Sequence, residues 1–118
     1  MNNGIYELSD DGKTLLDVTD KNISEAVIPD GVTHIGDKAF DYCHELKNID
    51  VAEGNQYFTS IDGVLFNKDL TQIIRYPEAK NGNQYTIPDS VTHIGNSAFY
   101  ECRALQSIDI PNSVTHIG

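Results

Sequence analysis

Three histidines occupy the same place in a repeated pentapeptide: His34, His93 and His116 are each the third residue of "VTHIG". Neutral imidazole is a common ligand of transition metals, so histidines aligned on neighbouring strands form a candidate metal site. Each of these histidines also stands between a valine and an isoleucine that we expect to point inward, which favours a solvated position on a short strand. The second interpretation is the simpler one, and we expect no metal and no other cofactor.

Cys43 and Cys102 recur in the same way. A disulfide requires Cα atoms within about 7 Å of each other, and an intervening coil is expected to hold the two cysteines near or beyond that limit. We therefore expect each to be a small buried apolar residue. The sequence has no Gly-rich phosphate loop and no G-x-S-x-G motif, and "HELKN" lacks the second histidine of a zinc-protease helix. These observations predict a non-enzymatic protein without a catalytic residue.

The histidines and cysteines recur because the chain repeats itself. Residues 28–50 and 87–109 are segments of 23 residues that share fourteen identical positions, in the pattern I-P-D-x-V-T-H-I-G-x-x-A-F-x-x-C-x-x-L-x-x-I-D. A third copy begins as "IPNSVTHIG" at residues 110–118. A repeat of roughly 20–50 residues is typical of a solenoid, in which each unit buries its apolar side chains only against its neighbours.

The repeat predicts two short strands in each coil. Leu46, Ile49 and Val51 have the spacing of a strand whose alternate side chains point inward. A proline follows this strand and ends it, because proline cannot donate to a sheet ladder. These prolines are Pro29, Pro88 and Pro111. The β-branched "VTHIG" segment predicts the second strand, and its glycine is expected to permit a sharp corner.

One helical turn is predicted between the two strands. Asp37 stands where a helix cap belongs, and Asn96 is its counterpart. Ala39, Phe40 and Cys43 follow at helix-like offsets that place them on one buried face. The predicted fold class is therefore an α/β repeat solenoid, with mostly short strands and short helical turns.

Residues 52–86 interrupt the 23-residue pattern. Within them "VLF" and "QIIRY" flank the polar "NKDLT", which predicts an inserted β-hairpin. "GIYELSDDGKTLLDV" resembles a degenerate copy of this hairpin, since Gly4 and Gly63 each precede the first isoleucine of a repeat by 24 residues. We predict a single domain over residues 1–118, divided into a degenerate hairpin unit (1–27), a repeat (28–50), a hairpin-containing repeat (51–86), a repeat (87–109) and a partial repeat (110–118).

The pattern "IPxxVTHIGxxAFxxCxxLxxI" resembles the BspA-like leucine-rich repeat, and "SIDGVLFNKDLTQIIRYPEAKNGNQYTIP" resembles the hairpin insert of many members. The resemblance implies a right-handed leucine-rich-repeat solenoid. It also implies a surface adhesin or receptor from a bacterium, which binds a protein or glycan on a host or neighbouring cell. A cell-surface or secreted location follows from the resemblance alone.

Charge argues against two other classes of partner. The 118 residues carry a net charge of −10, and their basic residues are scattered singly. Phosphate backbones and anionic membranes repel such a chain, so we expect no nucleic-acid partner and no membrane insertion. No apolar run approaches the ~20 residues of a membrane span. "MNNGIYELSDDGK" has neither the basic start nor the apolar stretch of a signal peptide, which leaves a cytoplasmic location open.

The exposed strand face is the candidate binding surface. Solenoids use extended strand faces to bind partners, and tyrosine is enriched at interfaces. The alternative is that these polar side chains only solvate a sheet. The candidate residues are Asn48, Asp50, Ser107 and Asp109, with Tyr57, Phe58, Tyr76 and Tyr100 as added rings.

The last strand is the candidate for self-association. The sequence stops at Gly118 in the middle of a repeat, with no polar unit to cap the last coil. An uncapped strand edge can pair with another chain. We therefore expect either a truncated chain or a homodimer that forms through this edge, with Val114, Thr115, His116 and Ile117 at the contact.

Overall fold

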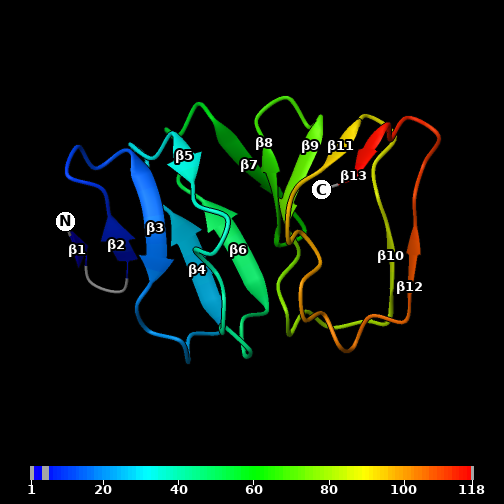
Figure 1. The fold of residues 1–118 in the computed structure, drawn as a ribbon, viewed down its shortest axis with the longest axis horizontal. Coiled ribbons are helices and arrows are strands. Elements are labelled where there is room, and N and C mark those ends of the chain that lie inside the picture. Colours follow the sequence, from blue (N-terminus) through cyan, green and yellow to red (C-terminus); the bar gives the residue numbers. More distant parts are fainter. Residues whose placement is uncertain (1, 4–5, 118) are drawn as a thin grey trace.

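A computed structural model describes residues 2–3 and 6–117 as thirteen short β-strands joined by turns. Gly4 and Gly118, which entered the repeat pattern, lie outside the described residues. Figure 1 shows the strands standing side by side along the long axis of the molecule, from β1 at one end to β12 and β13 at the other. The strands are β1 (Asn2–Asn3), β2 (Tyr6–Leu8), β3 (Thr14–Val18), β4 (Glu25–Ile28), β5 (His34–Ile35), β6 (Asn48–Val51), β7 (Phe58–Ile61), β8 (Val64–Asn67), β9 (Gln72–Arg75), β10 (Gln84–Thr86), β11 (His93–Ile94), β12 (Ser107–Asp109) and β13 (His116–Ile117).

The leucine-rich strand of each repeat forms a short parallel pair. β4 pairs with β6, and β10 pairs with β12. Ile49 of β6 is fully buried opposite Ala26 of β4, as expected from its spacing in the repeat. The chain leaves β4 directly before Pro29, where the sequence predicts the strand to end.

Two larger sheets hold the "VTHIG" strands and the hairpins. One has the order β1-β2-β3-β5, and the other has the order β13-β11-β9-β8-β7. In both, an antiparallel meander of three strands continues into parallel strands built from "VTHIG". β8 and β9 are the antiparallel pair expected from "VLF" and "QIIRY". The same arrangement in both sheets shows that a meander followed by a leucine-rich coil occurs twice along the chain (Figure 1).

The predicted helical turns are wrong. Among residues 2–3 and 6–117 there is no helix, and the segment after β5 is a chain of tight turns. Its backbone bonds join residues three apart, as in Cys43 N–H to the Phe40 carbonyl at 3.3 Å. Tyr42 has a φ of +65°, which a right-handed helix cannot include. The fold is therefore a β-solenoid, although Ala39, Phe40 and Cys43 are buried as predicted.

The corner glycines act through close packing rather than backbone freedom. Neither Gly36 nor Gly95 has a positive φ, so these positions do not use the left-handed backbone region that glycine favours. A Cβ on Gly95 would lie 3.0 Å from the carbonyl oxygen of Ile73 on the neighbouring strand. A Cβ on Gly36 would lie 3.4 Å from the carbonyl oxygen of Leu15. At Gly95 the neighbouring strand therefore lies closer than a side chain would readily allow, whereas a Cβ at Gly36 would make an ordinary van der Waals contact.

Apolar side chains form two clusters, and β8 contributes to both. Leu65 packs in the cluster of the first half of the chain, whereas Val64 and Phe66 pack in the cluster of the second half. All three are fully buried. Alternate residues of a strand point to opposite faces, so an uninterrupted apolar triplet fits a strand covered on both sides.

Glycine-to-alanine substitutions test the packing argument. We expect Gly95→Ala to lower the free energy of unfolding by about 1–3 kcal/mol, because the new methyl group meets backbone that has little room to move. Gly36→Ala, with its longer contact, should cost less. Gly31→Ala is the control, since a Cβ there meets nothing within 4 Å. Urea denaturation measures all three, and equal losses in Gly95→Ala and Gly31→Ala would refute the packing role.

Candidate functional site

The four predicted strand-face residues lie on the leucine-rich strands. Asn48 is half-buried and Asp50 is exposed on β6, and both Ser107 and Asp109 are exposed on β12. The two strands belong to separate two-stranded sheets, so these side chains do not form one continuous ladder. The predicted face therefore consists of two separate halves, one on β6 and one on β12.

The two aspartates have different surroundings. Asp109 accepts hydrogen bonds at Oδ2 from Gln84 Nε2 at 3.3 Å and from Thr86 Oγ1 at 3.2 Å. Within residues 6–117, no side chain or backbone group donates to the Asp50 carboxylate. Its partner across the strand pair is Val27, an apolar residue that is 46% exposed. Asp50 is therefore the carboxylate that is free to receive a donor from another molecule.

Asp50 lines a cleft of about 510 Å³ beside β4, β6 and β7, which we call the strand-face cleft. Two carboxylates, Asp50 and Glu53, face it, together with one ammonium group, that of Lys68. Lys68 Nζ already donates to the backbone carbonyl of Asn55 at 3.3 Å. The cleft therefore has an excess of negative charge. Val27, Val51, Thr59 and Ser60 add apolar and hydroxyl surface.

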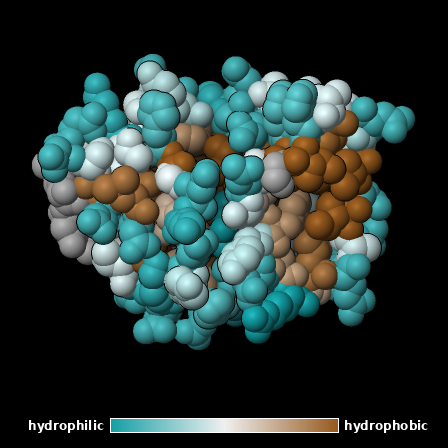
Figure 2. All heavy atoms as spheres, in the orientation of Figure 1, coloured by the Kyte–Doolittle hydropathy of each residue, from teal (hydrophilic) through white to brown (hydrophobic). Residues whose placement is uncertain are grey.

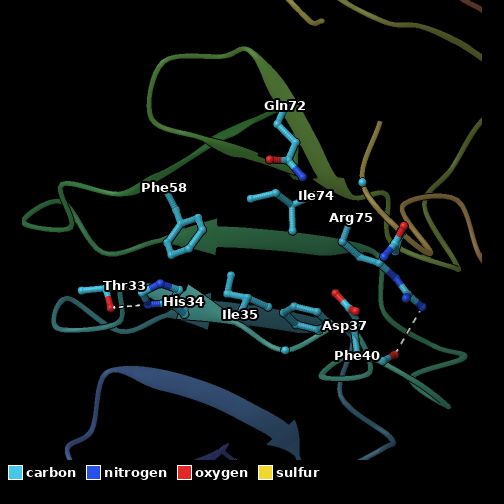
Figure 3. A pocket seen from close by; sticks show the side chains of 12 residues that line it. Thr33, His34, Ile35, Asp37, Phe40, Phe58, Gln72, Ile74 and Arg75 are labelled. Carbon is cyan, nitrogen blue, oxygen red and sulfur yellow. Dashed lines mark hydrogen bonds between the residues drawn. The ribbon is translucent and has the colours of Figure 1, made fainter. Parts of the chain in front are cut away.

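A second hollow, the inter-unit groove, has a volume of about 220 Å³ and separates β5 from β9. Figure 3 shows Ile35 and Ile74 extending toward the hollow from these two strands, with Phe58 at one end and Arg75 at the other. His34 and Gln72 are polar residues at its rim. Phe58 lines both the groove and the strand-face cleft, so one buried ring separates the two hollows.

An irregularity in strand pairing shapes the groove. β8 and β9 pair Leu65 with Arg75 and Phe66 with Ile73, so Ile74 is an extra residue on β9. Such a bulge redirects side chains. Ile74 packs against the first apolar cluster, whereas Ile73 packs in the second. The extra residue, Ile74, thus places its side chain in the gap between β9 and β5.

Arg75 closes the inner end of the groove and joins the two halves of the chain. Its guanidinium donates to the carbonyls of Phe40 at 3.4 Å and Ser97 at 3.2 Å, and to Glu78 Oε2 at 2.9 Å. Asp41 lies 3.8 Å away. Arg75 and Glu78 are both buried, so each depends on the other for charge compensation.

Glu78 also orients a histidine at the surface. His44 Nδ1 lies 2.6 Å from Glu78 Oε1. Since a carboxylate paired with arginine can only accept, Nδ1 carries the hydrogen and donates it. This buried ion pair was not predictable from the repeat, because Arg75 and Glu78 lie in the insertion and have no counterpart in the 23-residue pattern.

The repeated histidines are divided between the two large sheets. His93 and His116 are in register on β11 and β13, and their rings stack with centroids 4.4 Å apart. His34 lies on β5, opposite Thr14 of β3, and is separated from the other two by the groove. No group of three possible metal ligands occurs within the described part of the chain.

Both cysteines are free thiols. Cys43 is buried and burial raises its thiol pKa, whereas Cys102 is only partly buried. Burial of its thiol nevertheless raises the pKa of Cys102 to about 11. Both side chains therefore stay protonated at neutral pH and pack as small apolar groups.

The predicted aromatic surface is only partly correct. Tyr57 and Tyr100 are about half exposed, at 54% and 50%. Tyr76 is 2% exposed and Phe58 is 6% exposed, so the expectation that they display rings is wrong. Tyr76 is buried because it packs against Tyr85 at 5.1 Å and Phe99 at 5.5 Å between ring centroids. Tyr42, which was not among the predicted aromatic residues, is 68% exposed.

The residues predicted for self-association form the edge of the five-stranded sheet. Within the described residues β13 pairs with β11 alone, and Ile117 is 68% exposed. Thr115 and His116 are exposed, whereas Val114 is half-buried against the second apolar cluster. Ile110, before the last turn, is 50% exposed. Figure 2 shows apolar side chains gathered on the C-terminal half of the visible face.

The remaining cleft residues could not be predicted from the repeat. Thr59, Ser60 and Lys68 belong to the insertion, and they reach Asp50 only because β7 folds beside β6. Ser60 Oγ donates to the carbonyl of Ile49 at 2.5 Å and fixes that placement. A contact between the inserted strand β7 and the repeat strand β6 leaves no periodic pattern in the sequence.

Comparisons with known proteins agree with this geometry. A family model described as "BspA type Leucine rich repeat region" matches residues 18–81 and 76–118, with 6 copies of the repeat. A leucine-rich repeat protein from Eubacterium ventriosum is 34% identical with a TM-score of 0.77, over 80% of this chain and 26% of its own. The pneumococcal vaccine antigen PcpA is 34% identical with a TM-score of 0.67, over 79% of this chain and 29% of its own.

A leucine rich cell surface protein from Faecalibacterium prausnitzii is 25% identical with a TM-score of 0.64, over 93% of this chain and 34% of its own. The present chain thus spans between a quarter and about a third of the length of these relatives. No curated protein sequence matched it. Within residues 2–3 and 6–117, no helix is long and apolar enough to cross a membrane.

The Arg75–Glu78 ion pair can be tested by unfolding. We expect Arg75→Met to lower the free energy of unfolding by about 3–5 kcal/mol, because Glu78 is left buried without its counter-charge. Arg103→Met is the matched control, since Arg103 is 82% exposed in its pair with Glu101 and should contribute less than about 1 kcal/mol. Urea denaturation of both variants decides the question. Similar losses in the two would mean that the buried pair does not join the halves of the chain.

Proposed function

The chain belongs to the BspA-type leucine-rich repeat family, and from that membership we propose that it is a protein-binding module displayed at a bacterial cell surface. Its binding site in this proposal is the strand-face cleft, and its ligand there is a basic segment of a partner protein. Binding rather than catalysis fits a repeat solenoid, which presents a rigid, extended surface to its partner.

The observation that carries the proposal is the unpaired Asp50 carboxylate in a cleft with excess negative charge. Asp50 and Glu53 outnumber Lys68, whose ammonium group is already held by the Asn55 carbonyl. A lysine or arginine side chain supplies the missing donors, and its aliphatic stem fits the apolar surface of Val27 and Val51. The overall charge of −10 attracts such a segment from a distance.

The surface location is supported by the relatives. One of them is a cell surface protein and another is a vaccine antigen. Each is about three times as long as this chain, so the segment that resembles this chain lies within a longer protein in every case. Tyr57, half exposed on the segment that leads into β7, adds an aromatic ring near the cleft of the kind that interfaces favour.

A charge-reversal pair tests the cleft. An oligolysine peptide is titrated into the ¹⁵N-labelled protein, and amide shifts are expected around Val27, Asp50 and Ser60. Asp50→Lys should weaken binding by about fivefold or more, since it removes an interaction worth ~1 kcal/mol and adds repulsion.

Asp109→Lys is the matched control, because it changes the net charge equally at the same repeat position, where Gln84 and Thr86 already hold the carboxylate. It should leave most of the affinity intact. Equal weakening by both variants would mean that oligolysine affinity depends only on the net charge of the protein. If a neutral glycan shifts the amide resonances of the cleft and oligolysine does not, the proposed basic ligand is wrong.

Self-association is a second candidate function, favoured by the position of β13 at the edge of its sheet within residues 6–117. The occupant in this case is a second copy of the chain, because the edge presents the strand that already pairs in parallel with an identical sequence in β11. Exposed Ile110 and Ile117 supply the apolar contact.

Light scattering coupled to size exclusion measures this directly. We expect the mass to rise from monomer to dimer with concentration, and Ile117→Lys to abolish the rise. Leu16→Lys is the control, since Leu16 is 46% exposed on β3, which is paired on both sides. A monomeric mass at every concentration would remove this function.

A further inference from the structure

Two exposed imidazoles are stacked at the surface of the five-stranded sheet. His93 of β11 and His116 of β13 are in register, with ring centroids 4.4 Å apart and planes within 3° of parallel. Gln72 of β9 continues the same row on the other side of His93. Both histidines are exposed, so their outer nitrogens are open to solvent.

A threonine fixes the orientation of each ring. Nδ1 of His93 lies 2.7 Å from Thr92 Oγ1, and Nδ1 of His116 lies 2.9 Å from Thr115 Oγ1. Each threonine hydroxyl also donates to a backbone carbonyl next to the start of the neighbouring strand, Thr92 to Thr71 and Thr115 to Thr92, at 3.3 Å in both cases. A hydroxyl has one hydrogen. When that hydrogen goes to the carbonyl, Oγ1 accepts from Nδ1–H and the lone pair of each imidazole is at Nε2.

We propose that His93 and His116 together hold a divalent transition-metal ion of the Zn²⁺, Ni²⁺ or Cu²⁺ class through their two Nε2 atoms, with water completing the coordination. Imidazole nitrogens favour these ions. The metal–nitrogen distance of about 2.0–2.1 Å allows two ligands on one ion to lie up to about 4 Å apart. The ring centroids are 4.4 Å apart, so a small tilt of each exposed ring toward the other, with Nδ1 kept beside its threonine, is needed to bring the two Nε2 atoms onto one ion.

The hydrogen bonds at Nδ1 make this pair different from two histidines that are merely adjacent. A metal-bound histidine usually donates its other ring nitrogen to an acceptor, which fixes the tautomer and the ring orientation. Thr92 and Thr115 occupy that supporting position. The net charge of −10 also favours accumulation of cations near the surface.

The chain contains its own comparison. His34 stands in the same "VTHIG" sequence and has the same contact to a threonine, Thr33 Oγ1 at 2.8 Å. Its neighbour across the strand pair, however, is Thr14, so it has no second imidazole in register. A site that depends on pairing must therefore include His93 and His116 and exclude His34.

The experiment is a titration of the protein with Zn²⁺ alone, followed by calorimetry and by the ring-proton resonances of the histidines. One ion per monomeric chain is expected, with shifts confined to His93 and His116. His93→Ala and His116→Ala should each weaken binding by at least about tenfold, the smallest loss seen when even a supporting group of a metal ligand is removed. His34→Ala and His44→Ala should leave the affinity unchanged.

Threonine variants separate a positioned pair from an accidental one. Thr92→Val and Thr115→Val keep the side-chain shape and remove the acceptor, so each should weaken Zn²⁺ binding by about tenfold. Thr33→Val is the matched control and should have no effect. Circular dichroism checks that these surface variants keep the fold.

Three outcomes would overturn the proposal: no binding at micromolar Zn²⁺, equal losses in His34→Ala and His93→Ala, or one ion per two chains with a doubled mass. The last result would place the ion between two copies. The proposal does not depend on the strand-face cleft, because Zn²⁺ is titrated without any peptide present.

Discussion

The burial of β8 on both faces is the interaction on which the rest of the structure depends. Leu65 belongs to the first apolar cluster, and Val64 and Phe66 belong to the second. A repeat coil alone buries its side chains only against its neighbours, so an insertion could have split the solenoid into two independent stacks. The alternation of side chains along one strand instead gives both clusters a common wall.

This wall also explains where the two hollows lie. The meander that supplies β8 begins a new sheet, so the "VTHIG" strand β5 does not pair with β9. The gap becomes the inter-unit groove, and the bulge residue Ile74 partly fills it. Arg75, paired with Leu65 across β8 and β9, donates to the Phe40 carbonyl on one side of the gap and to the Ser97 carbonyl on the other. The start of the same meander forms one wall of the strand-face cleft.

The repeat made the strands, the buried positions and the family predictable. Strands and buried positions depend on contacts that recur in every 23-residue unit. Ile49 and Ala39 are examples, since every coil meets an equivalent coil at those positions. Features that arise from a local backbone conformation or from a contact made only once in the chain were not predictable. Tyr42 adopts a positive φ where a helical turn was expected, and the insertion residue Tyr76 is buried by an aromatic cluster that occurs only once. The corner glycine was noticed for its backbone freedom, but Gly95 matters because the Ile73 carbonyl is close.

Residues at equivalent repeat positions therefore differ in chemistry because their neighbours differ. Asp50 and Asp109 share a repeat position, yet one carboxylate is unpaired within the described chain and the other is held by Gln84 and Thr86. His34 and His93 share a pentapeptide, yet only His93 has an imidazole stacked in register. In a solenoid the sequence of a coil sets its shape, whereas the coil beside it sets the pairing of its polar groups. Function in such a protein is consequently a property of adjacent coils, and it can change along a chain whose repeat barely varies.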